Sequence, residues 1–393
     1  MIRDLSPQSL FMGFLTAFVG FASSFAVVLH GLTGAGATSL QAASGLMALS
    51  LAMGVCAIVL SLWTRLPVSI AWSTPGAALL ASSGMIDGGF AAAVGGFVVC
   101  AGLIVVAGLW RPLGRAVAAI PPPLANAMLA GVLVNLCLAP VKAIGFDPML
   151  GLPIVIAWAA GGAINRLLAV PAALLAFILV LAFGVEIPAG SLARLAETLG
   201  PPVAFVMPSF TLAGVVNVAM PLFIVTMASQ NIPGIAVLKV HGYEPDPGPL
   251  FAATGVFSLL AAPFGGHAVN LAAITAAMCA GEDSHPDPRR RYWSAVVAGG
   301  VYIVFGLFAG TVTAFVRLAP PILIEAVAGL ALVGAFAASA FAAFRDQDQR
   351  EAAAITFLVT ASGIAFAGIS GAFWGLLAGG LLTFLRHVTR RNA

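Results

Sequence analysis

Long apolar stretches with few charged residues follow one another along this sequence, and they restrict the folds available to it. A helix that crosses the hydrocarbon of a bilayer needs roughly 20 apolar residues. Of the 393 residues, 61% are hydrophobic and only 8% are charged, whereas soluble domains have about 25% charged residues. The composition therefore predicts an all-α polytopic membrane protein whose surface faces mainly lipid.

Hydropathy and helix-breaking residues divide the chain into 14 predicted transmembrane segments. They cover residues 11–30, 40–62, 68–83, 89–109, 116–136, 148–164, 168–185, 212–238, 249–262, 266–280, 293–315, 320–343, 353–369 and 371–387. Cytoplasmic loops carry an excess of Lys and Arg. With the N-terminus inside, 14 of the 17 Lys and Arg residues fall in cytoplasmic segments, and the exceptions are Lys142, Arg194 and Arg317. Both termini are therefore predicted to be cytoplasmic.

Several other classes of protein find no support in the sequence. The net charge of +3 is too small to indicate a nucleic-acid partner. The four cysteines lie inside apolar segments without metal-ligand spacing, so we expect no metal site and no cofactor. Paired acids or a nucleophile with a base are also missing, which argues against an enzyme. The polar N-terminus has no small-residue cleavage pattern, so no removable signal peptide is expected.

Two of the predicted spans are short and unusual. Segments 68–83 and 266–280 each open with a proline-led polar stretch and continue as a run of small residues. Irregular backbone at membrane depth is tolerated only where it is buried in protein or lines a cavity. We therefore predict an extended piece of chain followed by a half-helix in each segment.

The two halves of the chain resemble each other weakly. Three features recur in the same order about 200 residues apart: a polar break in a helix, a broken span and a Pro-Pro helix start. Each half, residues 1–200 and 201–393, then holds seven spans, and an odd number inverts the second half. Broken segments at matching places in such inverted repeats mark the binding sites of transporters.

His267 is the main ionisable candidate within the membrane. It begins the second broken span, after Gly265 and Gly266. A lone histidine is often only a core residue, but an unperturbed imidazole titrates near pH 6.5. His267 is therefore the predicted proton-coupling residue. Glu325, in the first turn of its helix, is interpreted as a complement to the helix dipole.

Polar side chains near the breaks complete the predicted substrate site. The candidates are Ser23, Ser24, Trp72, Ser73, Thr74, Gln230, Asn231, His267 and Asn270. Helix-to-helix hydrogen bonds would also explain Gln230 and Asn231, and bonds back to their own helix would explain the serines. Trp72 would either stack on an aromatic ligand or fill space.

The expected mechanism follows from the lack of a central Lys or Arg. The two half-helices would point their N-termini, each with roughly half a positive charge, at a common centre. That arrangement favours a carboxylate. A charge at the bilayer centre costs several kcal/mol, so binding one proton with the anion would ease its transfer.

Four segments resemble the bacterial benzoate–proton symporters of the BenE type. They are 21–29 (FASSFAVVL), 72–77 (WSTPGA), 227–235 (MASQNIPGI) and 263–275 (PFGGHAVNLAAIT). This family is distantly similar to the uracil and xanthine permeases. The resemblance implies 14 spans in a 7+7 inverted repeat, with a core of spans 1–4 and 8–11 and a gate of spans 5–7 and 12–14. It also implies short strands in spans 3 and 10 around the substrate, and a homodimer in the bacterial inner membrane.

The nucleobase permeases have acidic residues where this sequence has His267 and, in span 8, Ser229 or Gln230. Their absence favours an anionic substrate, which a carboxylate would repel. The resulting hypothesis is a secondary transporter that imports benzoate or a related aromatic carboxylate with a proton by alternating access. The alternatives are a transporter of another small anion or a neutral cyclic compound, and an anion channel.

Overall fold

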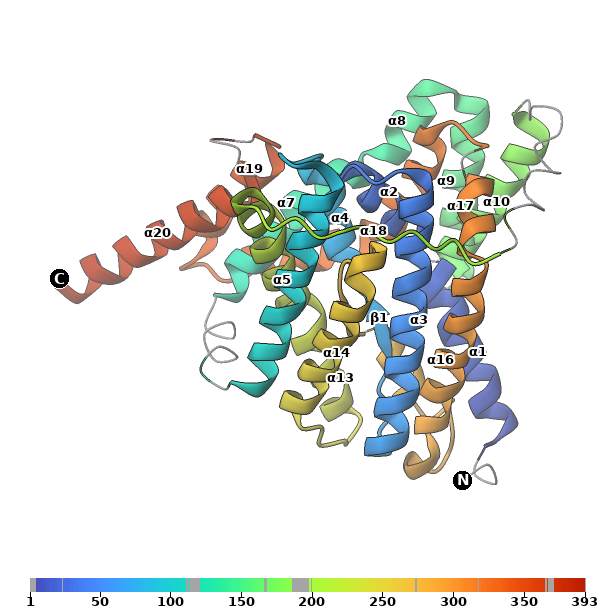
Figure 1. The fold of residues 1–393 in the computed structure, drawn as a ribbon. Helices are drawn as coiled ribbons and strands as arrows, with labels where there is room; N and C mark the ends of the chain where they lie inside the picture. Colours follow the sequence, from blue (N-terminus) through green and yellow to red (C-terminus); the bar gives the residue numbers. More distant parts are fainter. Residues whose placement is uncertain are drawn as a thin grey trace.

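The computed structural model describes residues 5–22, 24–110, 112, 121–165, 168–185, 198, 200–272, 274–316, 318–364, 366 and 371–392. Within them the fold is mostly helical, with two short strands (Figure 1). The first half contains α1 (Pro7–Ala22), α2 (Phe25–Gly34), α3 (Ser39–Thr64), β1 (Ile70–Trp72), α4 (Thr74–Ser83), α5 (Gly89–Leu109), α7 (Pro122–Cys137), α8 (Ala139–Phe146), α9 (Pro148–Ile164) and α10 (Ala169–Gly184).

The second half contains the remaining helices and the second strand. They are α12 (Met220–Thr226), α13 (Ile232–Val240), α14 (Pro247–Ala261), β2 (Val269–Leu271), α15 (Ile274–Ala280), α16 (Tyr292–Leu307), α17 (Ala309–Val316), α18 (Pro321–Phe344), α19 (Arg350–Ala361) and α20 (Gly371–Asn392).

Several helices are suited to a membrane. Among the described residues, seven helical segments are long and apolar enough to cross one, or eight if the bent pair Pro288–Leu307 and Ala309–Val316 forms a single span. Pro148–Ile164, Ala169–Gly184 and Gly371–Leu385 are apolar but shorter. Each of the 14 predicted spans contains a helix, but the number that cross the membrane stays a prediction. The separate short helix α8 was not anticipated.

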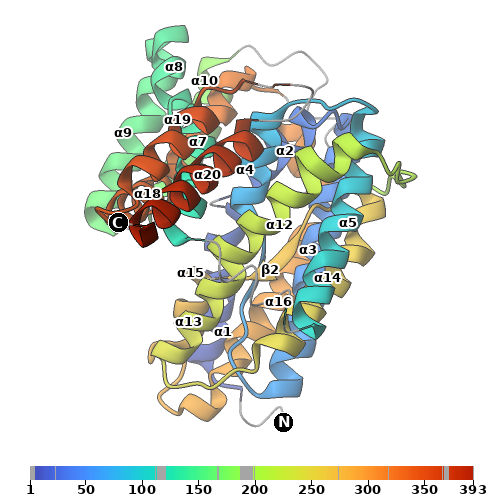
Figure 2. The same cartoon turned by 90° about the vertical axis from the view of Figure 1, so that its left-hand side faces the viewer.

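The helices form two groups (Figure 2). One contains α1 to α5 and α12 to α16, where α3 packs on α16, α5 on α14 and α2 on α4. The other contains α7 to α10 and α18 to α20, where α7 packs on α18 and α19. The groups meet where α4 contacts α7 and where α2 contacts α18.

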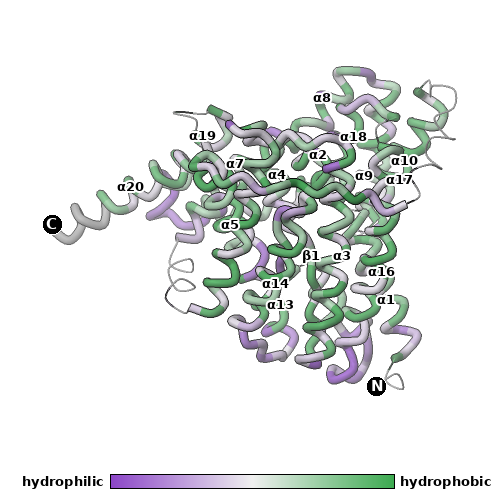
Figure 3. Tube along the Cα trace, viewed as in Figure 1, coloured by the Kyte–Doolittle hydropathy of each residue, from purple (hydrophilic) through white to green (hydrophobic). Residues whose placement is uncertain are grey.

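The hydrophilic parts of the chain lie mainly at the ends of the helices (Figure 3). A prominent set lies near the N-terminus, at the lower end of α3, α13, α14 and α16. Arg65 follows α3, and Arg289 and Arg290 precede α16. The apolar bulk between such ends is the distribution that a bilayer requires.

The predicted span 212–238 is helical throughout, although its helix is irregular. It includes π-helical segments at Gly214–Ala219 and Met227–Asn231. Pro221 and Pro233 follow these segments closely and lack the N–H that would bond the carbonyl four residues earlier. The freed carbonyls explain the wider turns. Single π-helical turns are frequent at functional sites.

Candidate functional site

Two short strands pair with each other within the helix group that contains α1 to α5 and α12 to α16. β1 and β2 are antiparallel, with Ile70 opposite Leu271 and Trp72 opposite Val269. The Ser73 N–H donates to the Ala268 carbonyl at 2.9 Å, and the Ala272 N–H donates to the Ser69 carbonyl at 3.0 Å. A helix follows each strand, α4 after β1 and α15 after β2. Ahead of β2, a 3-10 turn covers Ala262–Phe264 and ends at Gly265 with φ +91°.

Polar side chains from the neighbouring helices satisfy the outer edge of β2. The Val269 N–H donates to Ser258 Oγ at 2.8 Å, and the Leu271 N–H donates to Asn231 Oδ1 at 2.9 Å. Unpaired backbone groups at membrane depth cost several kcal/mol each. Gly234 permits this contact, because a Cβ there would lie 2.6 Å from the Leu271 Cβ. Asn231 is fully buried and so supports the strand.

We call β1 with α4, and β2 with α15, the two strand-and-helix units. Ser73 joins these two units. Its hydroxyl oxygen accepts from the Gly76 N–H at 3.2 Å, which caps α4, and from the Thr226 hydroxyl at 2.9 Å. The Asn270 side chain accepts from the Ser73 N–H at 2.9 Å and donates to the Leu271 carbonyl at 2.8 Å when its amide is oriented to satisfy both groups. His267 Nε2 donates to the Ser73 carbonyl at 2.9 Å. Every polar group of Ser73 is therefore engaged.

His267 is fully buried next to Ser73. Since its Nε2 lies against a carbonyl oxygen, Nε2 carries the hydrogen in the neutral ring. Its Nδ1 has no hydrogen-bond partner among the described residues. The ring of Phe97 packs against it edge-on, with centroids 6.4 Å apart. His267 can thus accept a proton at Nδ1 without losing its bond to Ser73.

A cavity of about 480 Å³ opens between the two helix groups. One wall comes from the strand-bearing group and includes Ser24, Trp72, Thr74 and Gln230. The opposite wall comes from the other group, and we call it the α7–α18 wall. Its residues are Asn126, Leu129, Ala331, Leu332, Ala335, Ala338, Ser339 and Ala342. None of the described residues that line the cavity is Asp, Glu, Lys, Arg or His.

Trp72 is held in place by both polar and aromatic contacts. Its Nε1–H donates to Ser24 Oγ at 2.9 Å, and Ser24 donates to the Gly20 carbonyl at 3.0 Å. Ser24 lies in the break between α1 and α2. The Phe21 ring packs edge-on against Trp72 with centroids 5.4 Å apart. The indole is only 2% exposed, so it forms a fixed and largely covered part of the cavity wall.

The rest of the wall from the strand-bearing group can bind a negative group without a formal positive charge. Thr74 is the first residue of α4, where the N–H has no partner within the helix and the helix dipole is positive. The Gln230 side chain lines the same cavity and has no hydrogen bond to any residue that the structure describes. These groups offer N–H and O–H donors beside an otherwise apolar space.

Comparison with known proteins assigns the chain to a family over nearly its whole length. The family profile described as benzoate membrane transport protein matches residues 3–385. The chain belongs to this family. The inner membrane protein YdcO of Escherichia coli K12 is 40% identical over 99% of this chain and 98% of its own length. The benzoate membrane transport protein of Acinetobacter baylyi is 31% identical over 98% of this chain and 96% of its own.

Solved structures share the fold of this benzoate-transport family member at low sequence identity. The transmembrane domain of the cyanobacterial bicarbonate transporter BicA has a TM-score of 0.60 at 13% identity, covering 96% of this chain and 98% of that one. Murine Slc26a9, an anion transporter in its inward-facing state, has a TM-score of 0.62 at 13% identity, covering 99% of this chain and 69% of that one. The chain is therefore a multi-pass membrane protein with a transporter fold.

The nine predicted site residues occupy three kinds of position in this family member. Ser24, Trp72, Thr74 and Gln230 line the cavity. Ser73, Asn231, His267 and Asn270 are buried around the strands and do not line it. Ser23 lies outside the described residues.

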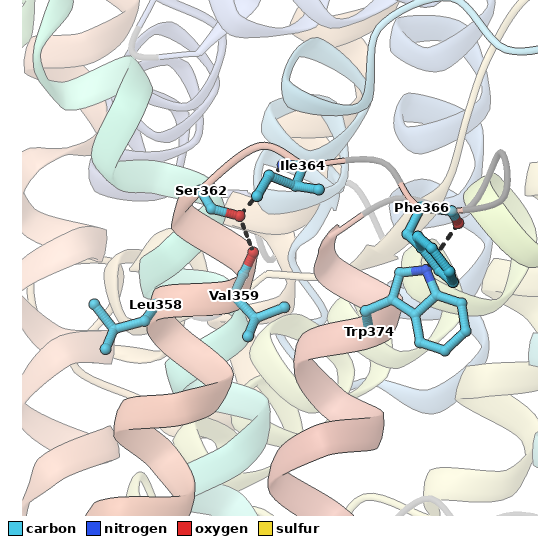
Figure 4. A pocket seen from close by; sticks show the side chains of 6 residues that line it. All are labelled: Leu358, Val359, Ser362, Ile364, Phe366 and Trp374. Atoms are coloured by element: carbon cyan, nitrogen blue, oxygen red, sulfur yellow. Dashed lines mark hydrogen bonds between the residues drawn. The ribbon is translucent and has the colours of Figure 1, made fainter.

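Asn126 and Ser339 reach the cavity from α7 and α18 but were not predicted as site residues. Each is an isolated polar residue in an apolar helix, which was their only sequence signal. A further hollow of about 390 Å³ lies between α19 and α20 (Figure 4). Its lining is apolar except for Ser362, which donates to the Val359 carbonyl, and Trp374, which donates to the Phe366 carbonyl. The described lining residues therefore offer no unbonded polar side chain to a substrate.

Proposed function

We propose that this member of the benzoate membrane transport family imports benzoate, or a related small aromatic carboxylate, with a proton across the bacterial inner membrane. The observation that best supports this proposal is the cavity between the two helix groups. It has hydrogen-bond donors at one wall, and none of its described lining residues is charged. A Lys or Arg side chain is unnecessary where a helix N-terminus and an amide face the anion.

The cavity fits the two parts of such a molecule. Trp72, Leu129 and Leu332 supply apolar surface for an aromatic ring. Thr74 and Gln230 supply donors for the carboxylate. None of the described lining residues of the cavity is acidic. The cavity therefore favours an anion over a nucleobase, because the ring N–H groups of a nucleobase need hydrogen-bond acceptors.

The architecture that we propose has 14 spans in two inverted repeats, residues 1–200 and 201–393. The core is spans 1–4 and 8–11, and the gate is spans 5–7 and 12–14. The antiparallel pairing of β1 and β2 supports this division, because similar strand-and-helix units of the two halves run in opposite directions. Substrate between core and gate would cross the membrane as the core moves against the gate.

The orientation with both termini in the cytoplasm places the second half of α18 on the inner side. The cavity residues of α18 run from Ala331, at the middle of the helix, to Ala342 in that half. On the outer side, His30 of α2 and Glu325 of α18 approach to 3.9 Å and join the two groups. The conformation is then open to the cytoplasm and closed to the outside.

His267 is the proposed proton carrier, acting through charge and not through contact with the substrate. A proton on its Nδ1 would add a positive charge beside Ser73, the residue that precedes Thr74 at the start of α4. The loaded site would then be close to neutral. Neutralisation lowers the several kcal/mol that a charge costs at the bilayer centre.

The test is uptake of labelled benzoate into proteoliposomes with an acidic exterior. A one-to-one symporter without net charge movement accumulates benzoate about tenfold per pH unit, since a pH unit is worth about 1.4 kcal/mol. Protein-free liposomes are the essential control, because neutral benzoic acid crosses bilayers unaided. The protein-dependent rate should saturate with benzoate and resist an excess of uracil. A protein-dependent rate that ignores the pH gradient and does not saturate would instead indicate an anion channel.

A further inference from the structure

We propose that the α7–α18 wall contains a subsite for a hydroxyl group on the substrate ring, formed by Ser339 and Asn126. The substrates would then include benzoates with a hydroxyl opposite the carboxylate. This inference deepens the proposed function and rests on it.

Ser339 differs from most buried hydroxyls in the helices, although Thr360 of α19 also lacks a partner among the described residues. Ser50, Ser258 and Thr313 each donate to the carbonyl four residues earlier, at 2.7 Å. Such bonds are the usual way to satisfy a hydroxyl in an apolar helix. Ser339 is only 6% exposed, yet the structure records no hydrogen bond for it among the described residues. It lines the cavity, so its hydroxyl remains available there.

Asn126 adds an acceptor to the same wall. Its Nδ2 donates to the Pro122 carbonyl at 2.8 Å, one turn back along α7. That bond turns the amide nitrogen toward its own helix, and Oδ1 has no partner among the residues that the structure describes. An amide oxygen accepts hydrogen bonds and cannot donate them. It therefore suits a group that carries a hydrogen and disfavours a carboxylate.

The two walls thus differ in the chemistry they offer. The strand-bearing wall presents the start of α4 and the Gln230 amide, which can donate to an anion. The α7–α18 wall presents the Asn126 acceptor and the Ser339 hydroxyl on a face that is otherwise alanine and leucine. Ala331, Ala335, Ala338, Ser339 and Ala342 share one face of α18, as their spacing requires. Small side chains there leave room for the ring.

This arrangement predicts which isomer gains from its hydroxyl. In 4-hydroxybenzoate the hydroxyl points away from the carboxylate, toward the α7–α18 wall. In 2-hydroxybenzoate it lies beside the carboxylate and bonds to it internally. Only the first can use Ser339 and Asn126. A net hydrogen bond is worth about a three- to tenfold change in affinity.

The experiment measures binding of benzoate, 4-hydroxybenzoate and 2-hydroxybenzoate to the purified full chain by calorimetry. The wild-type protein should bind 4-hydroxybenzoate about three- to tenfold more tightly than benzoate, with no such gain for the 2-isomer. Ser339→Ala should remove that gain, so that benzoate and 4-hydroxybenzoate bind with similar affinity. Thr313→Ala is the matched control, because it deletes a buried helical hydroxyl outside the cavity.

Equal affinity for benzoate and 4-hydroxybenzoate in the wild type would overturn the subsite, as would a gain that survives in Ser339→Ala. In both cases benzoate would still bind, so the proposed function would stand. If neither acid binds, the proposed function fails and the subsite fails with it. Asn126→Leu provides a second variant, and it should reduce the preference for 4-hydroxybenzoate in the same direction.

Discussion

The two strand-and-helix units have a similar backbone plan but present different side chains to the cavity. β1 and the start of α4 contribute Trp72, Thr74 and Pro75 to the cavity wall. β2 and α15 contribute Ala272 and Thr275, while His267 and Asn270 are buried and bond to Ser73 of the first unit. The first unit therefore presents an aromatic ring and the start of a helix to the cavity. The second unit holds the first in position and carries the titratable group.

This division changes how a charge could act on the substrate. His267 reaches the first unit through the backbone of Ser73 and does not line the cavity. A proton there would influence the anion through the field of a buried site, where screening by water is weak. The variants below test whether positioning and proton binding are separate properties of the second unit.

His267→Gln is expected to have the largest effect. The Gln amide can still donate to the Ser73 carbonyl, so the protein should fold and bind benzoate, but an amide does not titrate at physiological pH. Benzoate accumulation driven by a pH gradient should fall to the level seen without the gradient. Uptake into proteoliposomes at several external pH values measures this loss.

His241→Gln is the matched control for that substitution. His241 also bonds a helix carbonyl, that of Val237 at 2.9 Å, but lies at the end of α13 outside the cavity. Its replacement should leave the gradient response intact. A normal gradient response in His267→Gln would leave His267 with the positioning role alone and move the proton to another group.

Asn270→Leu should have a smaller effect and should act on stability. The change removes the bonds of the side chain to the Ser73 N–H and the Leu271 carbonyl at nearly constant volume. Hydrogen bonds inside membrane proteins contribute about 0.6 kcal/mol on average and up to about 1.7, so the free energy of unfolding should fall by about 1–2 kcal/mol. Reversible unfolding in mixed detergent measures it.

The control for this variant is Asn135→Leu. Asn135 donates to the Ala361 carbonyl at 3.1 Å from an exposed position on α7, so the loss there should be small. Equal losses in the two variants would mean that the junction at Ser73 has no special importance.

The sequence was sufficient to locate the breaks in the helices but not the orientation of side chains around them. Prolines and small polar residues in 68–83 and 266–280 disfavour continuous helix for local reasons. By contrast, His267 and Ser73 are separated by 194 positions, and their contact depends on how the strands pair. In a three-residue strand, no alternating pattern indicates which face is buried.

Ser339 illustrates the same limit from the other direction. A single serine among alanines usually bonds to its own helix, so its sequence context does not mark it as a site residue. Its role becomes visible only when the cavity and its missing helix bond are known together. Gln230 was easier to find, because a long amide in an apolar span has few local ways to satisfy its hydrogen bonds.

Trp72→Phe should have the smallest effect of the three and should act on ligand affinity. It keeps an aromatic ring in the cavity wall but removes the bond from Nε1 to Ser24 Oγ. Without that bond the ring is less firmly oriented, and benzoate affinity should fall about three- to fivefold, as for one net hydrogen bond. Calorimetry with benzoate measures it, with Trp63→Phe as control because Trp63 is 66% exposed on α3. If Trp72→Phe lowered stability as much as Asn270→Leu and left benzoate affinity unchanged, both units would be structural supports, and the ligand surface would have to be sought on Thr74 and Gln230.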